Sequence, residues 1–308
     1  IRVQLGSFLL FMGWRVVLIE ESDRLSIYLD NLKVSRNDHD ILIPIKDIHS
    51  LIIDNYKLVL SVQMLNKCVE NNVNIVTCGI DHSPKALVIP IAGHHRMVGV
   101  LRNQLEWTNE LKSVAHREIV IAKIKNQIKI LERCGISEDN VDKLRGYVLN
   151  VEESDKTNRE GLAAKVYFRL LFGDGFQRFN EDVLNGGLNY GYSILRSMIS
   201  KVVLSKGLNT ALGIIHIGPY NMFNLCDDII EPYRPIVDEW VYTNLRYAAE
   251  FTRDHRQSLV KMTTRKVYIN GQYHTLMNSI VLMTESIIDF FNTGNMIVFP
   301  EMQFKDDL

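Results

Sequence analysis

The sequence predicts an α+β fold in which a small, mostly β N-terminal domain precedes a larger, all-α domain. Short β-rich runs fill the first third of the chain, and from about residue 97 apolar residues recur every three or four positions. We expect the domains to span residues 12–93 and 94–308, with the boundary near Pro84, Pro90 and Gly93. Met12 is interpreted as the natural start, and residues 1–11 as a non-native extension.

Seven strands and one helix are expected in the first domain. Asp30-Asn31 lies between two β-rich runs and predicts a tight turn. The spacing of apolar residues over 60–70 predicts the helix. The strands are expected at residues 15–20, 25–29, 32–35, 41–45, 51–53, 74–78 and 86–91.

Most of the second domain has helical periodicity. Residues 97–133 are expected to form one long amphipathic helix or two, and residues 157–173 and 188–203 also carry apolar helix faces. Residues 266–276 are the exception, because Asn270-Gly271 between β-forming residues predicts a hairpin.

Composition limits the functional classes. Lys plus Arg (35) nearly balances Asp plus Glu (36), so nucleic-acid binding would require local basic patches. The four cysteines have no C-x-x-C spacing and are interpreted as reduced thiols of a cytoplasmic protein. We expect no membrane span, because no apolar run approaches roughly 18 residues. The absence of a G-x-x-x-x-G-K-[ST] motif predicts that ATP is not used.

Residues 212–239 contain a cluster of potential metal ligands. His216 precedes Asp227, Asp228 and Glu231, and carboxylate oxygens and imidazole nitrogens are suitable ligands for Mg²⁺ or Mn²⁺. Pro232 predicts either a kink or a helix boundary at Glu231. Alternatively, the two aspartates are a solvated helix start, and His216 is a half-buried histidine with a backbone partner.

Two further stretches carry polar residues on predicted helices. Thr157-x-x-Glu160 fits a helix-capping box, so Glu160 is either a capping residue or a catalytic acid. Tyr190, Tyr192 and Arg196 lie on the helix over 188–203, where the tyrosines belong either to the core or to a phosphate site.

The order and spacing of these stretches resemble the CRISPR-associated adaptation integrases, the spacer-acquisition nucleases of CRISPR systems, with a form closest to type II-A. The stretches are NREGLAAKVYFRLLFG, LNYGYSILRS and a histidine followed by DDIIEPYRPIVD, and the opening around Trp14 also fits. The resemblance implies metal-dependent cutting and joining of DNA. It also implies that Glu160, His216 and Glu231 are catalytic and bind Mg²⁺ or Mn²⁺, with Asp228 as a helper.

The resemblance further implies that the chain works in a complex. The implied partners are double-stranded protospacer and repeat–leader DNA, a second copy of the chain, the small companion adaptation protein, the effector nuclease and a ring-forming adaptation protein. DNA phosphates are expected to contact basic residues that could instead be surface ion-pair residues: Arg159, Arg169, Arg178, Arg196 and Arg234. Two alternatives remain, a DNA-binding assembly subunit with an inactive or secondary site, and a stand-alone metallonuclease acting on branched DNA.

Overall fold

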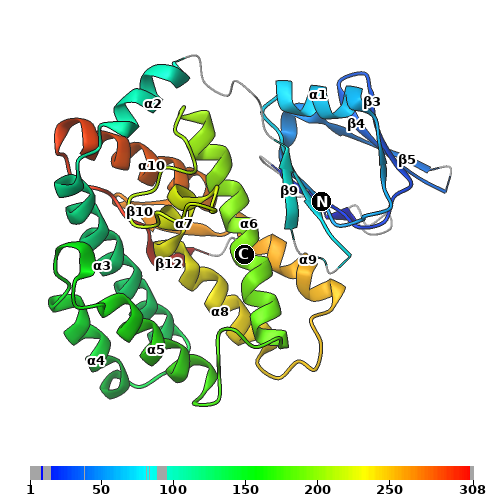
Figure 1. The fold of residues 1–308 in the computed structure, drawn as a ribbon. Coiled ribbons are helices and arrows are strands. Elements are labelled where there is room, and N and C mark those ends of the chain that lie inside the picture. The colour runs from blue at the N-terminus through cyan, green and yellow to red at the C-terminus, as the bar shows by residue number, and fades with distance from the viewer. Residues whose placement is uncertain are drawn as a thin grey trace. The chain divides into compact units, whose positions relative to one another are not determined.

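In this computed structural model, the described residues are 8–9, 15–37, 39–80, 82, 84–88 and 96–305. The chain divides into two compact units, Ile1–His95 and Arg96–Leu308 (Figure 1). The boundary predicted after residue 93 lies within 89–95, outside the described residues. Within the described parts of the chain, no helix is both long and apolar enough to cross a membrane.

Among its described residues, the first unit forms two sheets and one α-helix. A five-stranded sheet has the order β1-β2-β6-β8-β9, with β2, β6 and β8 parallel, and a four-stranded sheet has the order β5-β4-β3-β7. Every residue of β6 is buried, as expected for the central strand of a covered sheet. The elements are β1 (Phe8–Leu9), β2 (Arg15–Ile19), β3 (Arg24–Tyr28), β4 (Asn31–Arg36), β5 (His39–Pro44), β6 (Ile48–Ile53), β7 (Val59–Leu60), α1 (Val62–Glu70), β8 (Asn74–Cys78) and β9 (Pro84–Val88).

Some details of this unit differ from the sequence predictions. Tyr28 pairs with Asn31, so the two-residue turn is Leu29-Asp30, one position earlier than predicted. Both turn residues have positive φ, 45° and 59°, and Asn31 Nδ2 donates to the Leu29 carbonyl at 2.6 Å. Propensity favours Asn over Leu for positive φ, but strand register decided the position. Strand β1 lies within the predicted extension, and it pairs with β2.

The second unit is built around the central helix α3. Residues 97–133 form two helices, and Thr108 Oγ1 caps the second by accepting from the Leu111 amide at 3.3 Å. Helix α3 packs against α4, α5 and α8 (Figure 1). The helices are α2 (Met97–Leu105), α3 (Asn109–Arg133), α4 (Glu138–Leu149), α5 (Arg159–Phe172), α6 (Val183–Ser205), α7 (Asn224–Ile230), α8 (Arg234–Leu245), α9 (Arg253–Lys261) and α10 (Leu276–Thr293).

The second unit is mostly helical, as predicted, and its strands form a three-stranded sheet. The hairpin of β10 (Lys266–Ile269) and β11 (Gln272–Thr275) turns at Asn270-Gly271, as predicted. The third strand, β12 (Glu301–Lys305), was not predicted. Asn126 of α3 holds it, because Oδ1 accepts from the Met302 amide at 3.2 Å and Nδ2 donates to the Pro300 carbonyl at 2.8 Å. Such a long-range contact leaves no local sequence pattern.

A buried carboxyl joins three helices of this unit. Asp238 of α8 accepts hydrogen bonds from the hydroxyls of Tyr167 on α5, at 2.9 Å, and of Tyr192 on α6. Tyr190 and Tyr192 are both buried, so the structure places these tyrosines in the core. Burial raises the pKa of Asp238 to about 6, and the tyrosine hydrogen bonds partly oppose this shift.

We expect Asp238 to make the free energy of unfolding fall as the pH rises from about 4 to about 6. Its pKa is higher in the folded chain than the ordinary 3.8, so the folded state binds the proton more tightly across this window. A shift of roughly two units corresponds to about 3 kcal/mol. Asp238→Asn, which is neutral throughout, should lack this part of the slope in denaturant titrations. Equal slopes for the two proteins would contradict the assignment.

Candidate active site

Glu160 lies in the first turn of α5, and it is free of the capping role that its sequence position suggested. Asn158 is the capping residue, and its Oδ1 accepts an amide of the first turn at 3.2 Å. Asp155 accepts two more amides, those of residues 159 and 160, at 2.8 and 2.9 Å. Thr157 and Glu160 therefore do not form the capping box, and the Glu160 carboxylate is available for other contacts.

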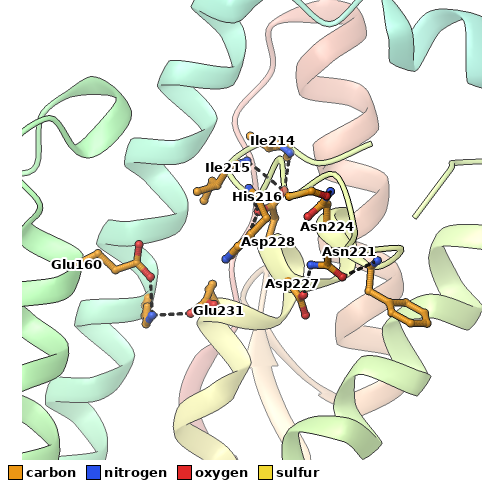
Figure 2. Close-up of polar contacts among 12 residues, drawn as sticks. Glu160, Ile214, Ile215, His216, Asn221, Asn224, Asp227, Asp228 and Glu231 are labelled. Carbon is orange, nitrogen blue, oxygen red and sulfur yellow. Dashed lines mark hydrogen bonds and ion pairs between the residues drawn. The ribbon is translucent and has the colours of Figure 1, made fainter. Parts of the chain in front are cut away.

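The carboxylates of Glu160 and Glu231 share one ammonium group. Lys123 Nζ on α3 lies 2.6 Å from Glu160 Oε1 and 2.5 Å from Glu231 Oε2 (Figure 2). Burial opposes the charge of Lys123, but the two carboxylates outweigh it and raise the pKa of the ammonium. Although burial also acts against the Glu231 charge, Lys123 and Arg234 lower the pKa of Glu231 to about 2.

Glu231 lies at the boundary that Pro232 imposes. Helix α7 ends at Ile230, and the 3-10 turn η3 (Glu231–Tyr233) leads into α8, as the proline predicted. The Pro232 carbonyl accepts from Asn126 Nδ2 of α3 at 2.8 Å, which fixes this turn against the central helix. Arg234 Nε donates to Glu231 Oε1 at 2.9 Å, and the guanidinium lies 4.6 Å from the Tyr192 ring centroid.

Asp228 holds the loop that carries His216. Its carboxylate is fully buried and accepts from the amides of Ile214, Ile215 and His216 at 2.5, 3.1 and 2.9 Å. Oδ1 also binds His216 Nδ1 at 2.7 Å, which leaves Nε2 as the ring nitrogen available to a ligand or substrate. The loop is tight, because a Cβ at Gly213 would lie 2.2 Å from the His216 carbonyl oxygen.

The charges of this pair depend on each other. The hydrogen bond to Asp228 raises the pKa of His216 against the effect of burial, and Glu231 adds to the increase. Burial raises the pKa of Asp228, while the hydrogen bonds from the ring and from backbone amides oppose that shift. The His216 ring is therefore bound to a carboxylate, and not to the backbone partner considered as an alternative in the sequence analysis.

Asp227 makes its side-chain hydrogen bonds to residues other than His216. Arg196 Nε of α6 donates to its Oδ1 at 2.7 Å, and Asn221 Nδ2 donates to its Oδ2 at 2.8 Å. Asp227 and Asp228 are 5% and 0% exposed, so the interpretation of this pair as a solvated helix start is wrong.

The structure therefore brings the predicted residues together in two pairs. Glu160 and Glu231 share Lys123, and His216 is bound to Asp228 (Figure 2). Among the residues that the structure describes, no three His, Cys, Asp or Glu side chains are grouped so that they could hold a metal ion. Two carboxylates that already bind one cation, and an imidazole with an available nitrogen, fit the preferences of Mg²⁺ and Mn²⁺. Metal binding by Glu160, His216 and Glu231 stays a prediction.

Sequence analysis missed three polar residues of this region, Lys123, Asp155 and His116. Lys123 interrupts an apolar stretch of α3, IVIAKI, and a lysine at an apolar position of a helix is a signal for a buried ion pair. His116 lies seven residues earlier on α3 and is half-buried. Burial lowers the pKa of His116, while the charges of Glu160 and Asp155 act against that shift, which places it beside the same cluster.

The five arginines proposed to contact DNA all have partners within the chain. Arg196 binds Asp227 and Arg234 binds Glu231, so both also support the candidate site. Arg178 donates to Asn185 and Asn189, Arg169 pairs with Asp174, and Arg159 donates to Thr157. Their contacts with DNA stay predictions.

The loop between His216 and α7 carries exposed apolar side chains. Ile217, Tyr220 and Met222 are 81%, 98% and 66% exposed. Asn224 fixes the loop backbone, because its Nδ2 donates to the Gly218 carbonyl at 3.0 Å. A groove of about 310 Å³ is lined by this loop and by residues of α2 and α3.

A family model described as CRISPR associated protein Cas1 matches residues 16–272, which is most of the chain. The chain belongs to the Cas1 family. It is 32% identical over 278 residues to the CRISPR-associated endonuclease Cas1 of Neisseria meningitidis serogroup C (strain 8013), covering 89% of this chain and 91% of the relative. The resemblance of the three motifs is thus confirmed at the level of the family, and type II-A stays a prediction.

Solved structures share the fold of this Cas1 protein. A Cas1 protein from Thermotoga maritima has a TM-score of 0.75 at 16% identity, covering 96% of this chain and all of that one. A casposase bound to an integration product has a TM-score of 0.72 at 18% identity, covering 91% of each chain. A chain of a Cas6-RT-Cas1–Cas2 complex has a TM-score of 0.73 at 17% identity, covering 94% of this chain and 36% of that one.

Proposed function

We propose that this Cas1 protein is a metal-dependent DNA integrase and endonuclease that inserts new spacers into a CRISPR array. One observation carries the proposal. The carboxylates of Glu160 and Glu231 face each other across the Lys123 ammonium, beside the His216–Asp228 pair. The endonuclease name of the Neisseria relative and the integration product bound to the casposase support it. Carboxylates that face a shared cation suit phosphodiester chemistry, because they can hold positive charge against the reacting phosphate.

The proposed reaction is a transesterification. The 3′-OH oxygen of the incoming DNA forms a bond to a repeat phosphorus while the original phosphorus–oxygen bond breaks, so one phosphodiester replaces another and no ATP is consumed. A bound Mg²⁺ or Mn²⁺ supplies Lewis-acid stabilisation of charge on the phosphate. Glu160, His216 and Glu231 would hold it. Asp228 fixes the ring of His216 through Nδ1, so Nε2 can act as a ligand or move the proton of the attacking hydroxyl.

The proposed partners extend the same function. We propose that double-stranded DNA, a second copy of the chain joined through the first unit, and a Cas2-type companion assemble with it in the cytoplasm. The Cas1–Cas2 complex among the structures of similar fold supports the companion. The effector nuclease and the ring-forming adaptation protein stay predictions from the type II-A resemblance.

A joining assay tests the function. A supercoiled CRISPR plasmid, a short duplex, Mn²⁺ and the Cas2-type companion should yield joined DNA without ATP. A duplex ending in 3′-dideoxynucleotides should bind but not join, because the attacking hydroxyl is missing. Joining that requires ATP would contradict the transesterification. Cutting without joining would favour a stand-alone metallonuclease, and binding without any reaction would favour a DNA-binding assembly subunit.

Tyr220 should contribute to DNA binding near the reacting phosphate. Its ring is exposed four residues after His216, on a loop that the Asn224 side chain fixes through the Gly218 carbonyl, so a nucleobase can stack on it. Stacking is worth roughly 1–3 kcal/mol per base, so we expect Tyr220→Ala to weaken DNA binding about 5- to 150-fold in anisotropy titrations. Tyr247→Ala is the control, because Tyr247 is 88% exposed on another segment. Equal DNA affinities of the two variants would contradict stacking on Tyr220.

A further inference from the structure

Lys123 places an ammonium group where two of the proposed metal ligands face each other. Its Nζ lies 2.6 Å from Glu160 Oε1 and 2.5 Å from Glu231 Oε2, and the side chain is only 11% exposed. A divalent metal bound by these glutamates would need their oxygens at roughly 2.0–2.6 Å. The ammonium and the metal therefore compete for the same carboxylate oxygens.

Because Arg234 is a second counter-ion of Glu231, a metal ion can replace the Lys123 ammonium without leaving Glu231 unpaired. Arg234 neutralises Glu231 from the other carboxylate oxygen, Oε1, at 2.9 Å. Its guanidinium also packs against Tyr192, so it is held in place. Lysine instead carries a compact charge on a flexible four-carbon stem. Glu231 thus has one fixed counter-ion and one that can move.

We propose that Lys123 is an internal counter-cation, which holds the place of the divalent metal between Glu160 and Glu231 until DNA binds. The inference rests on the proposed metal-dependent function and adds the order in which the site is filled. When a metal takes the carboxylates, the ammonium needs another anion, and a DNA phosphate supplies it. Metal and DNA binding therefore strengthen each other, and the protein without DNA binds metal weakly.

Mn²⁺ binding to the DNA-free chain tests the proposal without relying on activity. Free Mn²⁺ is measured by electron paramagnetic resonance for the native protein, Lys123→Met, Lys123→Arg and Lys129→Met. Lys129 is a matched control, since it lies on the same helix and pairs with Glu301 at 3.2 Å near the surface. We expect Lys123→Met to bind Mn²⁺ at least about 10-fold more tightly than the native protein, within the usual range of coupling between sites. Lys129→Met should match the native protein.

Two further measurements cover a variant that folds poorly. If Lys123→Met folds only when Mn²⁺ is present, the metal has replaced the ammonium, which supports the proposal. If Lys123→Met folds neither with nor without Mn²⁺, the Lys123→Arg variant decides. The planar guanidinium should bind the two carboxylates more firmly than the ammonium and so weaken Mn²⁺ binding. Tighter Mn²⁺ binding by Lys123→Arg would overturn the proposal.

The failure of this inference can be told apart from the failure of the proposed function. Suppose the native protein binds Mn²⁺ with 3′-dideoxy DNA, and DNA-free Lys123→Met binds it no more tightly than DNA-free native protein. The counter-cation role is then overturned, and the metal-dependent function stands. If no variant binds Mn²⁺ even with DNA, the metal-dependent function fails and this inference fails with it.

Discussion

Glu231→Gln is expected to lose DNA joining by at least about 10²-fold, the scale typical of removing one acid–base or charge-stabilising group. The neutral amide has the same shape but cannot balance a divalent cation, and it leaves Lys123 and Arg234 with one carboxylate fewer. Measured without metal, affinity for DNA should stay within a few-fold, because most phosphate contacts come from basic residues elsewhere. It can even rise, since one negative charge near the phosphate has been removed.

Joining rates and DNA affinity are measured separately for this variant. His216→Ala should show the same pattern, a loss of joining with DNA binding retained, because the ring nitrogen that we propose to bind the metal or to move the proton is removed. Circular dichroism and thermal unfolding confirm that each variant is folded. Arg196→Ala should instead weaken binding and reduce its salt dependence. If Glu231→Gln joins DNA at the native rate, the acidic cluster only holds the two cations, and the assembly-subunit function gains support.

The sequence predicted those features of the site that local chemistry determines. Pro232 predicted either a kink or a helix boundary at Glu231, and the structure has the boundary there. The choice between capping and catalysis at Glu160 could not be made locally. Asn158, in a left-handed conformation, and Asp155 compete for the same first-turn amides as Thr157, and all three have suitable side chains.

The partners of the site residues depend on contacts between distant segments. Lys123 binds Glu160, which lies 37 positions later in the chain, and Glu231, which lies farther still. Only the packing of α3 against α5 and η3 brings these three side chains together. The same holds for β12, whose position depends on Asn126 of α3. Periodicity predicts that such helices exist, and it does not predict which of their faces meet.

Asp228→Asn is expected to reduce joining by at least about 10²-fold, close to the effect of His216→Ala, through a change in the histidine tautomer. In the native protein the carboxylate can only accept, so Nδ1 carries the proton and Nε2 of the neutral ring keeps its lone pair. One side of an asparagine amide donates. When the amide nitrogen faces Nδ1, it favours the tautomer that carries the proton on Nε2. In that tautomer Nε2 can neither bind a metal nor accept a proton.

Stability should change as well, because the Asp228 carboxylate accepts three backbone amides besides the ring. An asparagine leaves at least one of these four donors without an acceptor, at roughly 1–3 kcal/mol per buried group. Nitrogen NMR of the His216 ring separates the two effects, because a lost tautomer preference is visible in a protein that is still folded. Asp227→Asn is the matched control, since Asp227 binds Arg196 and Asn221 rather than the histidine. Native joining by Asp228→Asn, or the same loss in Asp227→Asn, would show that the acids act only by holding the loop in place.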